Sequence, residues 1–421
     1  MSALTITEAV VTPIAFSDPP LLNAAGVHQP WALRSIIEVH TADGIGGLGE
    51  SYGDEQHLVL LRRAAAALKG LDAFDLAGLR RRCAEAIGSS EAPDRHGLTG
   101  ASSIDKTLAR VVAAFETGLL DIQGRALGRP VTDLLGGKVR DTVPFSAYLF
   151  YKWDRHPDAE PDEWGAALDP DGIVAQARRM IDRYGFGSIK LKGGVFPPDE
   201  EIAAIAALRD AFGDHPLRLD PNAAWTVDTS IAVAEQTEGL LEYLEDPAPG
   251  IDGMAAVAAR APMPLATNMC VVGFADIAEG FGKRAVGVVL GDHHFWGGLR
   301  ATGELGAMCR AWDVGMSMHS NSHLGISLAA MTHAAAATPQ LTYAVDTHYP
   351  WQDGHDVIER PLSFVDGAIE VPAGPGLGVD LDRDALARAH ADYETCGIRF
   401  RDDETYLRRF DPTFRIRKAH W

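Results

Sequence analysis

Cysteine is scarce in this chain of 421 residues, and the spacing of the few cysteines argues against two kinds of scaffold. They lie far apart in the sequence, at Cys83, Cys270, Cys309 and Cys396. The chain therefore lacks a Cys-x-x-Cys pair for zinc and gives no framework for the disulfides of a small secreted domain. We expect a reduced, cytoplasmic setting.

Long apolar runs are missing as well. No stretch reaches the roughly eighteen uncharged apolar residues of a membrane span, and residues 1–16 lack the basic and apolar regions of a secretory signal. The formal net charge is -20, which argues against nucleic acid and anionic membranes as partners. We expect a soluble acidic enzyme that acts on a small molecule and forms a homo-oligomer.

The length of the chain exceeds what one hydrophobic core usually supports, so two structural units are expected. Residues 6–16 and 35–50 alternate apolar and polar side chains and contain glycine turns, which predicts an antiparallel sheet. Residues 55–127 carry helical periodicity. We predict an α+β unit over residues 1–140, in which the long connection 17–30 is a candidate lid.

After Val143, short Val-, Ile- and Leu-rich segments recur with helical patterns between most of them. Eight strands are predicted, at 145–151, 188–192, 217–220, 241–245, 264–268, 286–291, 314–319 and 341–346. This alternation is typical of a TIM-type barrel, here over residues 141–366. A doubly wound sheet could use the same segments, but no Gly-x-Gly-x-x-Gly motif follows an early strand. Residues 367–421 contain a predicted strand and helix, and are expected to pack back on the first unit.

Polar side chains stand where the predicted strands end. In order they are Lys190, Lys192, Asp220, Asn222, Glu245, Asn268, Asp292 and His319. A parallel barrel presents the carboxyl ends of its strands at one rim, so we expect these side chains to share one site.

Lys190 and Lys192 are two residues apart on one predicted strand, so their side chains point to the same face. Mutual repulsion and partial desolvation would lower the pKa of a lysine enough for it to act as a base. The alternative is a solvated pair on an exposed strand edge, which is the more common arrangement for an isolated Lys-x-Lys.

Asp220, Glu245 and Asn268 are oxygen donors on three successive predicted strands. This is the hard-oxygen set that Mg²⁺ takes. The short segments that contain these residues are, taken singly, common at the start of a loop. Their repetition at one rim of the barrel favours a metal site. Asn222 points the same way as Asp220 and could bond a ligand or a lysine.

Asp292 and His319 follow on the next two strands. A carboxylate that bonds one imidazole nitrogen fixes the tautomer and raises the basicity of the other nitrogen. We interpret His293 and His294 mainly as packing or supporting groups, because neighbours on a strand point in opposite directions. A lysine and a histidine on opposite sides of a metal-bound ligand suit removal of a proton next to a carboxylate.

With these residues in place, the sequence resembles the enolase superfamily, and within it the glucarate dehydratases of the mandelate-racemase subgroup. The matching segments are IKLKGG at 189–194, DPNAAW at 220–225, YLEDP at 243–247, ATNM at 266–269, DHHFW at 292–296 and HSNSHLGIS at 319–327. Asn268 resembles that family specifically, since most relatives in the superfamily carry a carboxylate there.

The resemblance implies a modified (β/α)7β barrel, residues 141–366, with an N-terminal α+β capping domain, residues 1–140, completed by the C-terminal tail. It implies that Mg²⁺ is bound by Asp220, Glu245 and Asn268. It also implies that Lys192 and the paired His319 and Asp292 are the acid/base groups. Lys190 and Asn222 would neutralise charge or contact substrate.

By the same resemblance, the reaction is dehydration of the aldarates D-glucarate and L-idarate to 5-keto-4-deoxyglucarate. The implied substrate contacts are His28, Tyr148, Asn321, His348 and Arg401, and residues 93–106 should help enclose the substrate. Three alternatives stay open: dehydration of galactarate or an aldonate, racemisation or epimerisation of an acid sugar, and a noncatalytic relative that acts as a partner protein.

Overall fold

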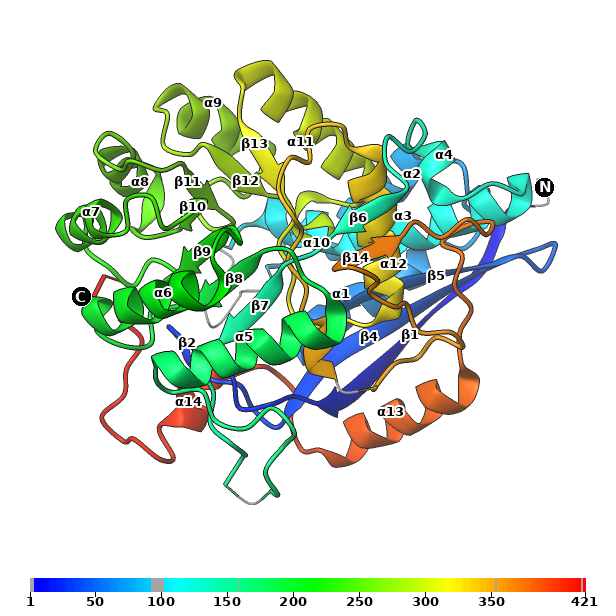
Figure 1. The fold of residues 1–421 in the computed structure, drawn as a ribbon. Coiled ribbons are helices and arrows are strands. Elements are labelled where there is room, and N and C mark those ends of the chain that lie inside the picture. The colour runs from blue at the N-terminus through cyan, green and yellow to red at the C-terminus, as the bar shows by residue number, and fades with distance from the viewer. Residues whose placement is uncertain (1–3, 92–101, 158, 353, 418) are drawn as a thin grey trace.

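The protein was studied as a computed structural model, which describes residues 4–91, 102–157, 159–352, 354–417 and 419–421. Its N-terminal part is a small sheet with three helices, and the rest is dominated by a ring of parallel strands with helices outside it (Figure 1).

An antiparallel sheet forms the base of the N-terminal part. Its strands are β1 (Ile6–Ser17), β4 (Trp31–Thr41) and β5 (Gly46–Tyr52), in the order β1-β4-β5. The helices are α1 (Glu55–Ala67), α2 (Leu76–Ile87) and α3 (Ile104–Leu127). A Cβ on Gly47 or Gly49 would collide with the backbone of α3, so these glycines let the long helix lie directly on β5. The predicted antiparallel sheet is confirmed.

The connection predicted as a lid is a short hairpin, β2 (Leu22–Asn23) with β3 (Gly26–Val27). Its Leu22 N donates to Tyr151 O at 2.7 Å, and its Asn23 Nδ2 donates to Asp403 Oδ2 at 2.9 Å. The hairpin is therefore tied both to the start of the barrel and to the C-terminal segment.

Seven parallel strands form the barrel sheet in chain order. They are β7 (Ala147–Phe150), β8 (Ile189–Lys192), β9 (Leu217–Asp220), β10 (Tyr243–Glu245), β11 (Leu265–Thr267), β12 (Val288–Leu290) and β13 (Gly315–Ser317). The helices after them are α5 (Pro170–Tyr184), α6 (Pro198–Phe212), α7 (Val227–Gln236), α8 (Gly250–Ala258), α9 (Phe274–Gly282), α11 (Leu299–Trp312) and α12 (Gly325–Ala337). A one-turn helix, α10 (His293–Trp296), precedes α11.

The eighth predicted strand closes the ring without being a regular strand. Parallel bridges join Leu341 to Met316 and Val345 to Phe145, and Ser146 N donates to Val345 O at 2.9 Å. The result is a modified (β/α)7β barrel with an N-terminal capping domain, so the predicted fold class is confirmed. The prediction of a regular eighth strand is wrong, because this segment forms isolated bridges rather than a continuous ladder, and Thr342 N and Tyr343 N both donate to Met316 O.

The C-terminal segment contacts both the N-terminal sheet and the barrel. It contains β14 (Ala368–Glu370), which pairs with β6 (Thr142–Pro144), then α13 (Arg383–Thr395) and α14 (Asp403–Leu407). Helix α13 lies along β1 (Figure 1), where His390 Nδ1 donates to Pro13 O at 2.7 Å. The last residues return to the barrel, since Thr226 N donates to Trp421 O at 2.8 Å. Two short helices, α4 (Val131–Leu134) and the 3-10 turn Tyr349–Gln352, complete the elements.

Within the described part of the chain, no helix combines the length and the apolar character that crossing a bilayer would require.

Candidate active site

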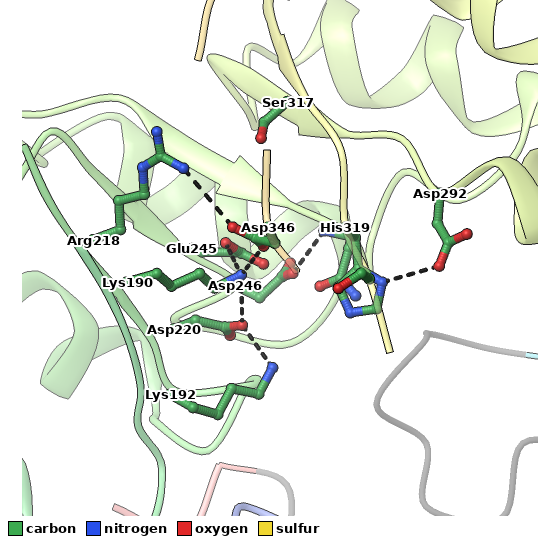
Figure 2. A network of polar contacts seen from close by, with 12 residues as sticks. Lys190, Lys192, Arg218, Asp220, Glu245, Asp246, Asp292, Ser317, His319 and Asp346 are labelled. Atoms are coloured by element: carbon green, nitrogen blue, oxygen red, sulfur yellow. Dashed lines mark hydrogen bonds and ion pairs between the residues drawn. The ribbon is translucent and has the colours of Figure 1, made fainter. Parts of the chain in front are cut away.

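The charged residues and the histidine predicted at the strand ends lie close together at the carboxyl ends of the barrel strands (Figure 2). Each predicted residue is at least nine-tenths buried: Lys190, Lys192, Asp220, Asn222, Glu245, Asn268, Asp292 and His319. The alternative of a solvated lysine pair is therefore wrong. The structure brings the predicted set together at one rim.

Lys190 lies at the centre of three carboxylates. Its Nζ is 2.7 Å from Glu245 Oε2, 2.7 Å from Asp346 Oδ2 and 3.3 Å from Asp220 Oδ2. Burial would lower the pKa of Lys190, but the carboxylates, Asp346 and Glu245 above all, hold it well above its ordinary value. The prediction that the paired lysines depress the pKa is thus wrong for Lys190, which is a permanent cation. The predicted role of Lys192 as a base stays a prediction.

Lys192 contacts the carboxylate of Asp220, which Lys190 also contacts. Its Nζ lies 2.7 Å from Asp220 Oδ2, so that oxygen stands between the two ammonium groups (Figure 2). Burial would raise the pKa of Asp220, but Lys192 and Lys190 lower it to about 2. Asp220 is therefore an anion at neutral pH.

The acidic cluster fits a divalent cation. Glu245 Oε1 is buried and accepts no hydrogen bond from any residue the structure describes. Burial and the neighbouring Asp220 raise the pKa of Glu245 well above its usual range, which indicates that the carboxylate of Glu245 lacks compensating positive charge. Asn268 adds an amide oxygen at the end of the next strand, and this donor set is the one that Mg²⁺ prefers.

Asp246 fixes the loop that carries Asn268. Its Oδ2 accepts from Asn268 N at 2.8 Å and its Oδ1 accepts from Thr267 Oγ1 at 2.5 Å. The backbone of Asp246 has φ 38°, a left-handed conformation that the side-chain contacts hold in place. Burial and Asp220 raise the pKa of Asp246 to about 7.

Asp292 holds two histidines, one on each carboxylate oxygen. Its Oδ2 is 3.2 Å from His319 Nδ1, and its Oδ1 is 2.8 Å from His294 Nδ1. Burial would raise the pKa of Asp292, but the imidazoles of His294 and His319 hold it well below its usual value. Because a carboxylate accepts, Nδ1–H of His319 donates and its Nε2 keeps a free lone pair.

Burial lowers the pKa of His319, although Asp292 opposes the shift. The ring is therefore neutral at neutral pH and can act as a base. The predicted pairing of Asp292 with His319 is the one seen in the structure.

The interpretation of His293 and His294 as strand neighbours is wrong. The strand ends at Leu290, and Asp292 caps the one-turn helix α10 by accepting from His294 N at 2.9 Å. The turn folds the ring of His294 back onto Asp292. Asp292, His293 and His294 offer ligand atoms within 4.8 Å of one another, but His294 Nε2 lies 3.0 Å from the cationic Arg34 Nη2, which disfavours a metal there.

The predicted substrate contacts form a second group beside the rim. His28 stacks on His348 with ring centroids 6.2 Å apart, and Tyr148 packs edge-on against His348 at 4.9 Å. Arg401 Nη2 lies 2.7 Å from His28 Nε2, and Asn321 lines the same small cavity as Arg401. Most of the predicted enclosing segment, residues 93–101, lies outside the described residues.

Asp403 balances the charge of Arg401, because its carboxylate lies 2.7 Å from Arg401 Nη2 and also accepts from Nε. His28 is held from its other side by Asp18, whose Oδ2 is 3.0 Å from Nδ1. The structure thus places all five predicted contacts near one another, and it shows that Arg401 is already engaged by protein groups.

Asp346, Arg218 and Glu201 lie at or beside this rim and were not among the predicted site residues. Asp346 binds Lys190, and Arg218 lies 3.8 Å from the other oxygen of Asp346 (Figure 2). Glu201 accepts from the backbone N–H groups of the loop after Lys192, at 2.9 to 3.1 Å. Asp346 could have been found, since it ends the eighth predicted strand at the same rim. Arg218 and Glu201 have no comparable signal, because ordinary strands and helices carry such residues.

Two protein-family models match the sequence of this chain. The model of the mandelate racemase / muconate lactonizing enzyme N-terminal domain matches residues 6–136, and the model of the enolase C-terminal domain-like family matches residues 172–385. The chain belongs to the enolase superfamily of enzymes, in its mandelate-racemase subgroup.

Within that superfamily, three relatives are similar over nearly the whole chain. A protein of Streptomyces coelicolor named "Probable glucarate dehydratase" is 56% identical and covers 97% of each chain. A crystal structure of an enolase from Thermobispora bispora, complexed with magnesium and formate, is 64% identical with TM-score 0.98, over 99% of this chain and 100% of that one. Another, from Pseudomonas fluorescens with magnesium, potassium and tartrate, is 49% identical with TM-score 0.97, over 100% of each chain.

Proposed function

We propose that this protein is a magnesium-dependent dehydratase of D-glucarate and L-idarate that forms 5-keto-4-deoxyglucarate. The observation that carries the proposal is the placement of Lys192 and the Asp292–His319 pair around one carboxylate-rich metal site. The Streptomyces coelicolor relative named "Probable glucarate dehydratase" supports the substrate class. The relative crystallised with magnesium and tartrate, a dicarboxylate, supports the metal and the kind of ligand.

In this mechanism, Asp220, Glu245 and Asn268 would hold the metal. Bound magnesium would supply positive charge to the substrate carboxylate, and so make the neighbouring proton more acidic. The chain's own cation, Lys190, adds positive charge at the same place and is kept protonated by Asp346.

The two proposed bases, Lys192 and His319, would remove the substrate proton. Either Lys192 or His319 Nε2 takes the proton next to the carboxylate, and the choice depends on which face of the substrate carries it. The hydroxyl on the next carbon then leaves as water after accepting a proton, and the resulting enol becomes the keto product. Epimers at the attacked carbon would thus use opposite bases and give one product.

The proposal is tested by incubating the purified protein with magnesium and a panel of acid sugars, and by measuring keto product. Turnover of D-glucarate or L-idarate is expected. Turnover of another aldarate alone, such as galactarate, would refute the substrate assignment.

A noncatalytic role makes a different prediction. An enzyme should exchange the α-proton of its substrate with solvent deuterium, and Lys192→Ala together with His319→Asn should abolish that exchange. A protein that catalyses no exchange with any acid sugar would fit a partner role instead.

A further inference from the structure

Arg34 connects the capping domain to the proposed histidine base. It lies on β4 and is 1% exposed. Its Nε donates to Glu50 Oε1 at 2.8 Å, and its Nη2 donates to His294 Nε2 at 3.0 Å. Since His294 bonds Asp292, which bonds His319, an unbroken series of contacts runs from Arg34 to the base.

Hydrogen-bonding chemistry fixes the protons along this series. A guanidinium group can only donate, so Arg34 favours an Nε2 of His294 that accepts and a ring proton on Nδ1. Ser327 Oγ, 2.9 Å from the same Nε2, accepts from Arg34 Nη2 at 3.2 Å and can donate its hydroxyl proton to Nε2. The proton on Nδ1 points at Asp292 Oδ1, 2.8 Å away. The second oxygen of Asp292 is left for Nδ1–H of His319.

The charge of Arg34 has a further effect on His294. A protonated His294 would aim an N–H at the guanidinium, so two donors and two positive charges would meet at 3.0 Å. Arg34 therefore disfavours a hydrogen on Nε2 of His294. The negative charge of Asp292 is then available to the imidazolium that forms when His319 accepts a proton.

We propose that Arg34 is a positioning residue, which fixes the tautomer of His294 and thereby reserves Asp292 for His319. The proposal rests on the proposed function, since it concerns the base of that reaction. It assigns a role in proton transfer to a side chain of the capping domain.

Several contacts hold Arg34 in this orientation. Its guanidinium carbon lies 4.5 Å from the centre of the Tyr52 ring. Its partner Glu50 also accepts from Leu324 N and Ser327 N, each at 2.9 Å, at the start of α12. Besides Arg34, the titratable groups around His294 are Tyr52, His57, Asp292, His293 and His323.

The first test observes the unaltered protein and uses one variant only to assign signals. Nitrogen NMR of the ¹⁵N-histidine-labelled full-length protein reports which ring nitrogen of His294 carries hydrogen, with the signals assigned by their loss in His294→Asn. Hydrogen on Nδ1 and none on Nε2 is the expected result. A proton on Nε2 in the unaltered protein would overturn the proposal.

The second test compares two variants that both lack the charge of Glu50, so that no buried carboxylate is left unpaired. Glu50→Gln keeps Arg34 and should keep the ring proton of His294 on Nδ1. The double variant Glu50→Gln with Arg34→Met should let hydrogen appear on Nε2 of His294, because the donor that faces this nitrogen is gone. Identical histidine signals in both variants would contradict the proposed role.

Kinetic measurements distinguish a positioning role of Arg34 from a role in stabilising the fold alone. The double variant should lower kcat about tenfold or more relative to Glu50→Gln, with KM little changed, only for the epimer whose turnover His319→Asn abolishes. Arg34→Lys, which keeps a donor, should recover part of that loss. An equal loss for both epimers would mean that Arg34 only stabilises the fold. If the unaltered protein turns over no acid sugar, the proposed function fails, while the NMR tests still decide the role of Arg34.

Discussion

Lys190 and Asp346 form an ion pair at 2.7 Å between the second strand of the barrel and the segment that closes it. Neither side chain is exposed to solvent. The pair places a permanent positive charge under the proposed metal site, and it also links two segments that lie 156 residues apart in the sequence.

Replacing Asp346 by asparagine should reduce both stability and activity. Removing one partner of a buried ion pair typically costs about 3–5 kcal/mol of folding free energy, because the remaining charge is poorly compensated. We expect a clear fall in the Tm and in kcat, measured by calorimetry and by product formation. The matched control is Asp141→Asn, since the ion pair of Asp141 with Lys138 is exposed and should leave the Tm unchanged. Equal Tm values for both variants would contradict the structural role of the pair.

Removal of the metal should abolish turnover. Asp220 and Glu245 are buried carboxylates, and the oxygens of Glu245 accept no hydrogen bond from the described residues, so we expect magnesium to bind there and to raise the Tm. Exhaustive chelation followed by assay, and calorimetric titration with Mg²⁺, check this prediction. Glu245→Gln should weaken magnesium binding. Full activity after chelation would rule out the proposed mechanism.

The two proposed bases should be separable by substrate. Lys192→Ala and His319→Asn should each lower kcat by about 10²- to 10⁴-fold, but for opposite epimers. Deuterium exchange into D-glucarate and L-idarate, measured by NMR for each variant, tests this directly. A single base serving both epimers would show the same loss with both substrates, and would require a different assignment.

Because the pKa of Glu116 is raised, we predict that the folding stability falls as the pH rises toward neutrality. Its carboxylate is buried and accepts from Leu299 N at 2.7 Å at the start of α11, and burial raises its pKa from 4.5 to about 7. The folded protein therefore binds more protons than the unfolded chain between these values. Stability gained below pH 4.5 should be lost as the pH passes through about 7, by at most about 3 kcal/mol.

Denaturant unfolding at pH 5 and pH 7.5 measures the effect of Glu116. The variant Glu116→Gln should show a smaller difference between the two pH values than the unaltered protein. Glu279→Gln, at an exposed position on α9, serves as the control and should behave like the unaltered protein. Parallel behaviour of both variants would show that Glu116 is not the group responsible.

Much of this site could be predicted from sequence because parallel strands bring their carboxyl ends to one rim. That rule alone grouped Lys192, Asp220, Glu245 and His319, which come from four separate strands. It worked because each residue follows an apolar strand directly, so local pattern and long-range position coincide.

The residues that escaped prediction depend on contacts that local pattern does not encode. His294 was misplaced because one turn of helix, rather than continued strand, follows Asp292. Arg34 contacts His294 across 260 residues of sequence. Its isolated position on a strand gives no indication of a partner in another domain.

The irregular eighth segment bears on how the protein becomes active during folding. A chain that has ordered only its first seven strands already holds Asp220, Glu245 and Lys192, but Asp346 reaches Lys190 only when residues 341–346 join the ring. The charge balance of the catalytic centre is therefore completed by ring closure. Recovery of activity during refolding should report the last topological event of the barrel, later than any signal from secondary structure.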